Sequence, residues 1–267
     1  MSYSNKQFGQ TVMHDFQRRR DLLEKGGITA SAGTTLETRG LGHPMFEELR
    51  IGERRSARIA TVFLDLTNFT GRTFWDDAVE VTDLAHAILT GFVEVVSVFG
   101  GHPLGLRGDG LFAGFGPGKP DVVCSLALGA CAFALDGVQN ELNPRLAERG
   151  LEPVQARAGV DFGEVTFVRS GSQSRSEVNA IGFSANFAAK CEKAANSWEV
   201  VAGEGLVTQL GTNGRFSEHP DSPKHYQRDY QRRAYKYFDY RWRQVLPILP
   251  SVIQQLNGRP ASAITVG

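Results

Sequence analysis

Two aspartates in the sequence are placed where a pair of metal ions could be bound. Asp65 lies near the end of the apolar run 57–66, and Asp109 lies in a Gly-Asp-Gly segment between two short apolar runs. A carboxylate inside so apolar a run is costly to bury without a partner. If the two segments are neighbouring strands, a divalent cation such as Mg²⁺ or Mn²⁺, which prefers oxygen ligands, offsets the repulsion between the carboxylates. Two metal ions ~3.5–4 Å apart stabilise the attacking and leaving oxygens in phosphoryl transfer.

The pattern around these aspartates predicts the elements that would position them. Residues 57–66 are β-branched and apolar, as in a strand. The Asp-Gly pair between runs 102–107 and 111–115 is a strong hairpin signal, because glycine tolerates the positive φ of such turns. Helical spacing of apolar residues predicts long helices, and alternation predicts further strands. The helices are expected at 5–24, 74–99, 122–146 and 181–195, and the further strands at 154–161, 164–168, 199–202 and 233–240.

This order of elements predicts an α+β fold with a ferredoxin-like βαββαβ core. We expect an N-terminal helix and linker in residues 1–50, with the linker at 27–42. The main domain is expected at 51–245, closing with a C-terminal hairpin, and residues 246–267 are expected to form a tail.

Three motifs in this order resemble those of the catalytic domain of class III nucleotidyl cyclases. The F-x-D-I-x-x-F-T motif is matched by Phe63, Asp65, Leu66, Phe69 and Thr70. The G-D-x-x-x-A-x-F motif resembles Gly108, Asp109, Ala113 and Phe115. The G-x-x-V-N-x-A-A-R motif resembles residues 182–190, which include Asn186 and Lys190. The resemblance covers about residues 57–202, over half of the chain.

The resemblance implies conversion of a nucleoside triphosphate to a 3′,5′-cyclic monophosphate and pyrophosphate. By this likeness Asp65 and Asp109 hold two Mn²⁺ or Mg²⁺ ions, with the backbone carbonyl of Leu66 as a further ligand. The turn that follows would bring its backbone N–H groups near the triphosphate. The turn spans residues 68–71, and its candidate binding residues are Asn68, Phe69 and Thr70.

A second pair of residues is implied on the helix at 181–195. Asn186 matches the asparagine that orients the ribose, and Lys190 occupies the position of the arginine that stabilises transition-state charge. Lysine supplies the charge without the planar fork of arginine, so slower turnover or help from a second basic residue is expected.

The resemblance also implies a head-to-tail homodimer with two shared active sites. Asp65 and Asp109 of one subunit would face Asn186 and Lys190 of the other. Residues 169–179 resemble the dimerisation arm of the family.

The base pocket departs from the purine patterns of the family. At the first base-binding position adenylyl cyclases have lysine and guanylyl cyclases have glutamate, whereas this chain has Gly105. At the second position adenylyl cyclases have aspartate or threonine and guanylyl cyclases have cysteine, whereas this chain has Asn179. Gly105 has no donor for a purine edge, and Asn179 can donate to or accept from a pyrimidine. Phe183 or Arg107 would then fill the remaining space.

Without membrane spans or sensor domains in its sequence, the chain resembles the stand-alone pyrimidine cyclases of bacterial Pycsar antiphage systems. Those make cyclic UMP or cyclic CMP for a separate effector. We therefore expect a pyrimidine nucleoside triphosphate as substrate, with UTP favoured over CTP. An adenylyl cyclase with an atypical pocket and a catalytically dead, nucleotide-binding module are the alternatives.

The segment 224–245 interleaves seven Lys or Arg residues with seven aromatic residues. A hairpin with one buried aromatic face is favoured over a grip on single-stranded nucleic acid. The last hairpin of the family supplies a cation to the triphosphate. The candidates are Arg228, Arg232 and Arg233.

Composition excludes several other classes of protein. The 29 basic and 29 acidic residues cancel, so no global field attracts nucleic acid or a membrane surface, and we expect neither as a partner. The most apolar stretches, 89–99 and 124–135, are too short to span a bilayer, and no signal peptide is visible. Three cysteines without CxxC spacing and six histidines without ligand spacing predict no disulfide or zinc site. A soluble cytoplasmic protein is expected.

Overall fold

The computed structural model of the chain describes residues 3–24 and 40–256, and its centre is a ferredoxin-like core. Strand order β2-β3-β1-β4 in the sheet, with two connecting helices, confirms the predicted βαββαβ arrangement. The core elements in chain order are β1 (Arg54–Thr67), α3 (Ala78–Val98), β2 (His102–Arg107), β3 (Gly110–Phe115), α4 (Pro120–Asp136) and β4 (Gln155–Gly171).

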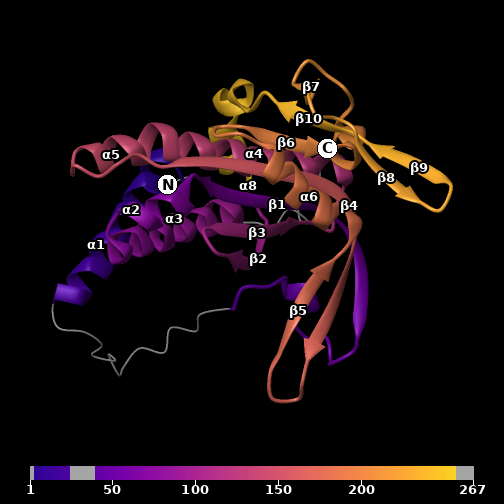
Figure 1. Cartoon of the computed structure of the whole chain (residues 1–267), viewed down its shortest axis with the longest axis horizontal. Coiled ribbons are helices and arrows are strands. Elements are labelled where there is room, and N and C mark those ends of the chain that lie inside the picture. Colours follow the sequence, from indigo (N-terminus) through magenta and orange to yellow (C-terminus); the bar gives the residue numbers. More distant parts are fainter. Residues whose placement is uncertain (1–2, 25–39, 257–267) are drawn as a thin grey trace.

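Three strands extend this sheet beyond β4. They follow in the order β6 (Val200–Gly203), β10 (Tyr237–Tyr240) and β7 (Phe216–Glu218). Strand β5 (Ser176–Ile181) pairs with the far end of β4, and the two form an arm that projects from the body (Figure 1). A separate hairpin of β8 (Lys224–Arg228) and β9 (Gln231–Tyr235) projects at another side (Figure 1).

The two faces of the sheet are covered differently. Helices α3 and α4 pack on one face, where they bury the side chains of Leu64 and Leu66 of β1. Helix α6 (Phe183–Ala194) packs on the other face, against β4 and β1. Because side chains alternate along a strand, Asp65 points to the α6 face.

Smaller elements complete the fold around this core. Helix α1 (Asn5–Glu24) packs on α3, and α8 (Leu249–Leu256) packs beside α4, so both share the main hydrophobic core. The remaining elements are η1 (Pro44–Phe46), α2 (Phe69–Trp75), the π-helical turn η2 (Gly137–Leu142), α5 (Asn143–Ala147), α7 (Glu204–Leu210) and η3 (Trp242–Ile248). Residues 25–39, which include most of the predicted linker, and 257–267, which include the end of the predicted tail, lie outside the described part.

The prediction of two strands at 154–161 and 164–168 is wrong. Strand β4 is continuous, and it pairs with β1 from Gln155 to Val168 without a break. Gly163 stays extended inside this ladder, opposite Ile59. A Cβ atom there would lie 3.0 Å from the Cβ of Ser184, so the glycine serves the close approach of α6 and does not make a turn.

Two other predicted elements are divided in the structure. The helix predicted at 74–99 begins at Ala78, because the Asp77 carboxylate accepts a hydrogen bond from the Glu80 amide and caps α3. The strand predicted at 233–240 is split at Lys236, with β9 in the projecting hairpin and β10 in the main sheet. The first division follows from a local cap, Asp77 with Glu80 three residues later, whereas the second is a tertiary effect that a local pattern does not carry.

Helix α3 and the helical segment Pro120–Ala147 are long and apolar enough to cross a membrane by length and composition. The stretches judged too short are therefore parts of longer helices. In their most apolar windows 56% and 78% of the residues are buried inside the fold. Both thus serve as core helices of this domain.

Candidate functional site

Asp65 lies near the end of β1, between two neighbouring strands. In the ladders it is opposite Gly110 of β3 and opposite Arg157 of β4. A Cβ atom on Gly110 would lie 2.9 Å from Oδ1 of Asp65. The missing side chain of Gly110 therefore leaves room for the carboxylate.

Asp109 lies in the turn between β2 and β3, directly before Gly110. Gly108 has a φ of +63°, the left-handed conformation that glycine adopts most easily. Burial and, second, the charge of Asp65 raise the pKa of Asp109 above its usual range. The charge of Asp65 thus acts on Asp109, as expected for neighbouring carboxylates.

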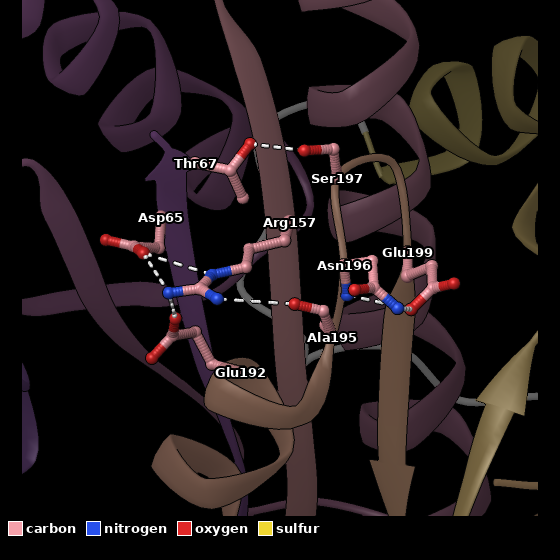
Figure 2. Close-up of polar contacts among 8 residues, drawn as sticks. All are labelled: Asp65, Thr67, Arg157, Glu192, Ala195, Asn196, Ser197 and Glu199. Atoms are coloured by element: carbon pink, nitrogen blue, oxygen red, sulfur yellow. Dashed lines mark hydrogen bonds and ion pairs between the residues drawn. The ribbon is translucent and has the colours of Figure 1, made fainter. Parts of the chain in front are cut away.

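Arg157 is a residue of this site that the sequence analysis missed (Figure 2). Its Nη2 lies 3.0 Å from Oδ2 of Asp65 and 2.6 Å from Oε1 of Glu192. Its Nη1 donates to the carbonyl oxygen of Ala195 at 3.3 Å. The one signal in the sequence is an arginine flanked by Ala156 and Ala158 inside the predicted strand 154–161.

Glu192, on the inner face of α6, was also missed. Its side chain is only 9% exposed. Burial, followed by the charge of Asp65, raises the pKa of Glu192 to about 7, against the opposing effect of Arg157. One guanidinium therefore compensates two carboxylates that come from different elements.

The predicted phosphate-binding turn lies beside this group. Asn68 has a φ of 58° and precedes α2 without a side-chain cap. Phe69 is buried in the main core, so only its backbone is available to a ligand. Thr70 lies in α2, and its side chain is outside the described part of the structure. Leu66 is the second-last residue of β1, so its backbone carbonyl lies just before this turn.

Asn186 and Lys190 lie on the exposed face of α6. The opposite face buries Ala188 and Glu192 against the sheet. In the described part of the chain, neither Asn186 nor Lys190 forms a hydrogen bond or ion pair with Asp65 or Asp109. Lys190 instead places its Nζ 5.3 Å from the ring centroid of Tyr226 on β8. One protomer therefore does not bring the two predicted pairs together.

The predicted base-pocket residues lie on strands that do not pair with each other. Gly105 is opposite Phe112 of β3, and a Cβ atom there would meet no atom within 4 Å. Asn179 lies on β5, in the arm, opposite Val168. Phe183 packs its ring against Tyr226 and other aromatic rings at the start of α6.

The candidate cations of the tail lie on the projecting hairpin. Arg232 and Arg233 are exposed on β9, and Arg228 is exposed at the end of β8. Arg107 is exposed at the end of β2, opposite Gly110.

A different group of potential ligands lies at the other side of the sheet. One ligand atom each of Glu199, His219 and Asp239 lies within 4.8 Å of the others. The amide of Asp221 donates to Nδ1 of His219 at 3.1 Å. A neutral imidazole then carries its proton on Nε2, the atom that faces Asp239, and offers no lone pair there. This arrangement favours a turn-stabilising histidine.

The Asp65–Asp109 pair fits divalent ions better. Both donors are hard carboxylate oxygens, which Mg²⁺ and Mn²⁺ prefer. Arg157 occupies Oδ2 of Asp65, and Oδ1 lies beside the space left by Gly110. Burial and, second, the charge of Asp65 raise the pKa of Asp109, and a cation at this position would offset the second of these effects.

Comparison with solved structures identifies the fold. A guanylyl cyclase superposes with a TM-score of 0.59 at 20% identity, over 72% of this chain and 94% of that chain. An adenylyl cyclase from Pseudomonas aeruginosa superposes with a TM-score of 0.60 at 18% identity, over 70% of this chain and 95% of that chain. The fold is that of a class III nucleotidyl cyclase catalytic domain. A class III adenylyl cyclase-like ATP-binding protein from Pseudomonas aeruginosa superposes with a TM-score of 0.58 at 20% identity, over 73% of this chain and 43% of that chain.

Sequence comparison places the cyclase domain near the pyrimidine cyclases. A cytidylate cyclase from Escherichia coli is 26% identical over 179 residues, which are 63% of this chain and 39% of the relative. A cytidylate cyclase from Staphylococcus aureus is 24% identical over 208 residues, which are 75% of this chain and 47% of the relative. The chain thus spans less than half the length of these curated relatives. No protein-family model matches the chain.

Proposed function

We propose that the chain is a nucleotidyl cyclase, which converts a nucleoside triphosphate to its 3′,5′-cyclic monophosphate and pyrophosphate. The observation that carries this proposal is the position of Asp65 opposite Gly110, the residue directly after Asp109, with Arg157 paired to Asp65. The cyclase fold and the cytidylate cyclase relatives support it.

In this proposal Asp65, Asp109 and the carbonyl of Leu66 hold two Mn²⁺ or Mg²⁺ ions. When bound, such ions acidify the ribose 3′-hydroxyl and offset charge on the phosphates. The backbone of Asn68 to Thr70 binds the triphosphate at the start of α2.

Asn186 orients the ribose, and Lys190 neutralises charge that develops on the α-phosphate in the transition state. Both face solvent in one protomer, away from Asp65. We propose that a head-to-tail homodimer supplies them to the aspartates of the other subunit, with the β4–β5 arm as a dimer contact. Arg232 and Arg233 are the candidates for a further contact to the triphosphate.

For the base we propose a pyrimidine, bound near Gly105 and Asn179. The open space at Gly105 and the amide of Asn179 support this choice. The sequence favours UTP over CTP, whereas the relatives are named cytidylate cyclases. The substrate test therefore measures both nucleotides.

We also propose that the cyclic nucleotide is a second messenger in antiphage defence, read by a separate effector in the cytoplasm. The Pycsar resemblance and the likeness to pyrimidine cyclases support this role.

The decisive experiment incubates the purified chain with Mn²⁺ and one of ATP, GTP, CTP or UTP, and identifies products by mass spectrometry. Cyclic CMP or cyclic UMP, lost in Asp65→Ala and Asp109→Ala variants that still fold, is the expected result. We expect a loss of at least about 100-fold, because metal stabilisation of phosphoryl transfer amounts to several kcal/mol. Cyclic AMP alone would refute the pyrimidine assignment. Nucleotide binding without any cyclic product would favour the dead module.

A further inference from the structure

A cavity of ≈ 650 Å³ lies beside α4, between that helix and the C-terminal elements η3 and α8. Its wall is mainly apolar, with Leu126 from α4, Ile248 from η3 and Val252 from α8 among its lining residues. Pockets that bind small ligands usually have volumes of about 300–1,000 Å³ and an apolar wall with a few polar groups. The cavity has both properties, and none of its lining residues belongs to the site around Asp65.

Tyr240, the last residue of β10, is the buried polar side chain of this cavity. It is 7% exposed, and within the described residues its hydroxyl has no hydrogen-bond partner. A buried tyrosine hydroxyl usually has one. Burial raises the pKa of Tyr240 to about 12, so the hydroxyl keeps its proton at neutral pH and can donate. A ligand in the cavity can therefore supply the acceptor.

Arg215, directly before β7, brings a positive charge to the same place. Its charge lowers the pKa of Tyr240, against the effect of burial, so the guanidinium lies near the phenol hydroxyl. Arg215 is exposed and forms no ion pair with any residue that the structure describes. The one carboxylate in the lining, Asp121, is exposed at the start of α4. Tyr240 and Arg215 thus offer two donors, one of them charged, to a single acceptor group.

These two donors and the apolar wall select an aliphatic carboxylate as ligand. A carboxylate has two acceptor oxygens and one negative charge, which match one hydroxyl and one guanidinium. A hydrocarbon chain gains free energy when leucine, isoleucine and valine side chains remove it from water. A doubly charged phosphate would exceed the single cation, and an ammonium group would have the same sign as Arg215.

We propose that this cavity is a binding site for a medium-chain fatty acid. Its carboxylate binds Tyr240 and Arg215, and its chain lies among α4, η3 and α8. The site does not depend on the proposed function, because it shares no residue with the proposed nucleotide site. It borders α4, which packs against β1, so an occupied cavity stabilises the folded domain that carries Asp65.

The test titrates the purified chain with decanoate, below its micellar concentration, by isothermal titration calorimetry. We expect saturable binding, weaker binding of decanol and no binding of decyltrimethylammonium. Tyr240→Phe should weaken decanoate binding at least about tenfold, as for a lost hydrogen bond to a charged group. Arg215→Gln should weaken it about fivefold, the upper range for an exposed ion pair. Val252→Trp, which fills the cavity, should abolish binding.

Two matched variants serve as controls. Tyr230→Phe changes a fully exposed tyrosine, and Arg243→Gln changes an exposed arginine of η3 outside the lining. Both should bind decanoate like the unmodified chain. Thermal unfolding checks that all variants fold, and Tyr240→Phe should unfold near the unmodified midpoint because its hydroxyl has no partner to lose among the described residues.

Two results would overturn the proposal. Equal affinity for decanoate and decanol, with normal binding in Tyr240→Phe and Arg215→Gln, would reduce the cavity to an unspecific apolar surface. No saturable binding of any of the three probes would show that the cavity is closed to small ligands in solution, with another segment of the chain or a second copy over it.

Discussion

Arg157 lies opposite Asp65 in the β1–β4 ladder and donates two hydrogen bonds to one oxygen of its carboxylate, at 3.0 and 3.2 Å. The same guanidinium reaches Glu192 on α6 (Figure 2). The Arg157 guanidinium thus joins β1 of the sheet to α6, and it does so at Asp65, one of the proposed metal ligands.

Removal of Arg157 should destabilise the fold. In Arg157→Met the nearly buried carboxylate of Glu192 loses its cation, and we expect the free energy of unfolding to fall by about 3 kcal/mol. The Arg157→Met/Glu192→Met double variant should regain part of it, because the nearly buried pair is then gone and only Asp65, whose side chain is 20% exposed, is left without its cation. Urea unfolding measures all three proteins. Arg145→Met is the control, since Arg145 pairs with the partly exposed Glu141 and should cost about 1 kcal/mol or less. A double variant as unstable as the single one would contradict the explanation.

A side chain at Gly159 should displace α6. A Cβ atom there would lie 2.0 Å from the amide nitrogen of Glu192 and 2.2 Å from the carbonyl oxygen of Ala188. Both are backbone atoms of the helix, so Gly159→Ala should lower the free energy of unfolding by about 3 kcal/mol or more. Gly105→Ala, where a Cβ meets open space, should change it by less than about 0.5 kcal/mol. Similar unfolding midpoints for the two variants would show that α6 adapts without cost.

Tyr226 should position Lys190 through its ring. If the proposed function holds, Tyr226→Leu should lower kcat about two- to fivefold, the usual range for an exposed cation–π contact. Tyr226→Phe keeps the ring face and should leave kcat unchanged. In a Lys190→Ala background, Tyr226→Leu should have no further effect on the residual rate. Equal losses for the Phe and Leu variants would assign the effect to the hydroxyl group instead.

Asp161 should make stability fall with rising pH. Burial raises the pKa of Asp161 to about 7, although Tyr235 and the amide of Leu206 donate hydrogen bonds to its carboxylate. The folded state therefore keeps a proton that the unfolded state releases above its ordinary pKa of 3.8. This contribution is complete below pH 3.8, is lost as the pH rises to about 7, and then stays constant.

The slope is at most about 1.4 kcal/mol per pH unit for one proton. Asp161→Asn removes the titrating group, so its free energy of unfolding should vary less between pH 5 and about 7 than that of the unmodified chain. Urea unfolding at several pH values compares the two proteins. Parallel curves would show that Asp161 is ionised in the folded state.

Much of the core was predictable because its signals are local. The apolar run of β1, the Asp-Gly turn at Asp109 and the helical spacing of α3 each appear in a short window of sequence. Helix α1 was predicted with the bounds that the structure has. These elements owe their form to periodicity and turn chemistry, which short windows contain.

Arg157 and the role of Gly163 were missed because both depend on contacts between distant segments. Arg157 joins Asp65 and Glu192, which are 92 residues before it and 35 residues after it in the sequence. Gly163 resembles a strand break in the sequence, yet the close approach of Ser184 is the reason for it. Neither of these contacts can be predicted from a short window of sequence.

The length of β4 has a mechanical consequence. The strand carries Arg157 near one end and forms half of the projecting arm at the other, without a break between them. At the usual rise per residue this is a rod about 50 Å long, braced by β1 over most of its course. A load applied at the arm would be transmitted along the strand to Arg157 itself. A partner bound to the arm is therefore connected through one continuous strand to Arg157 and to the carboxylates of Asp65 and Glu192.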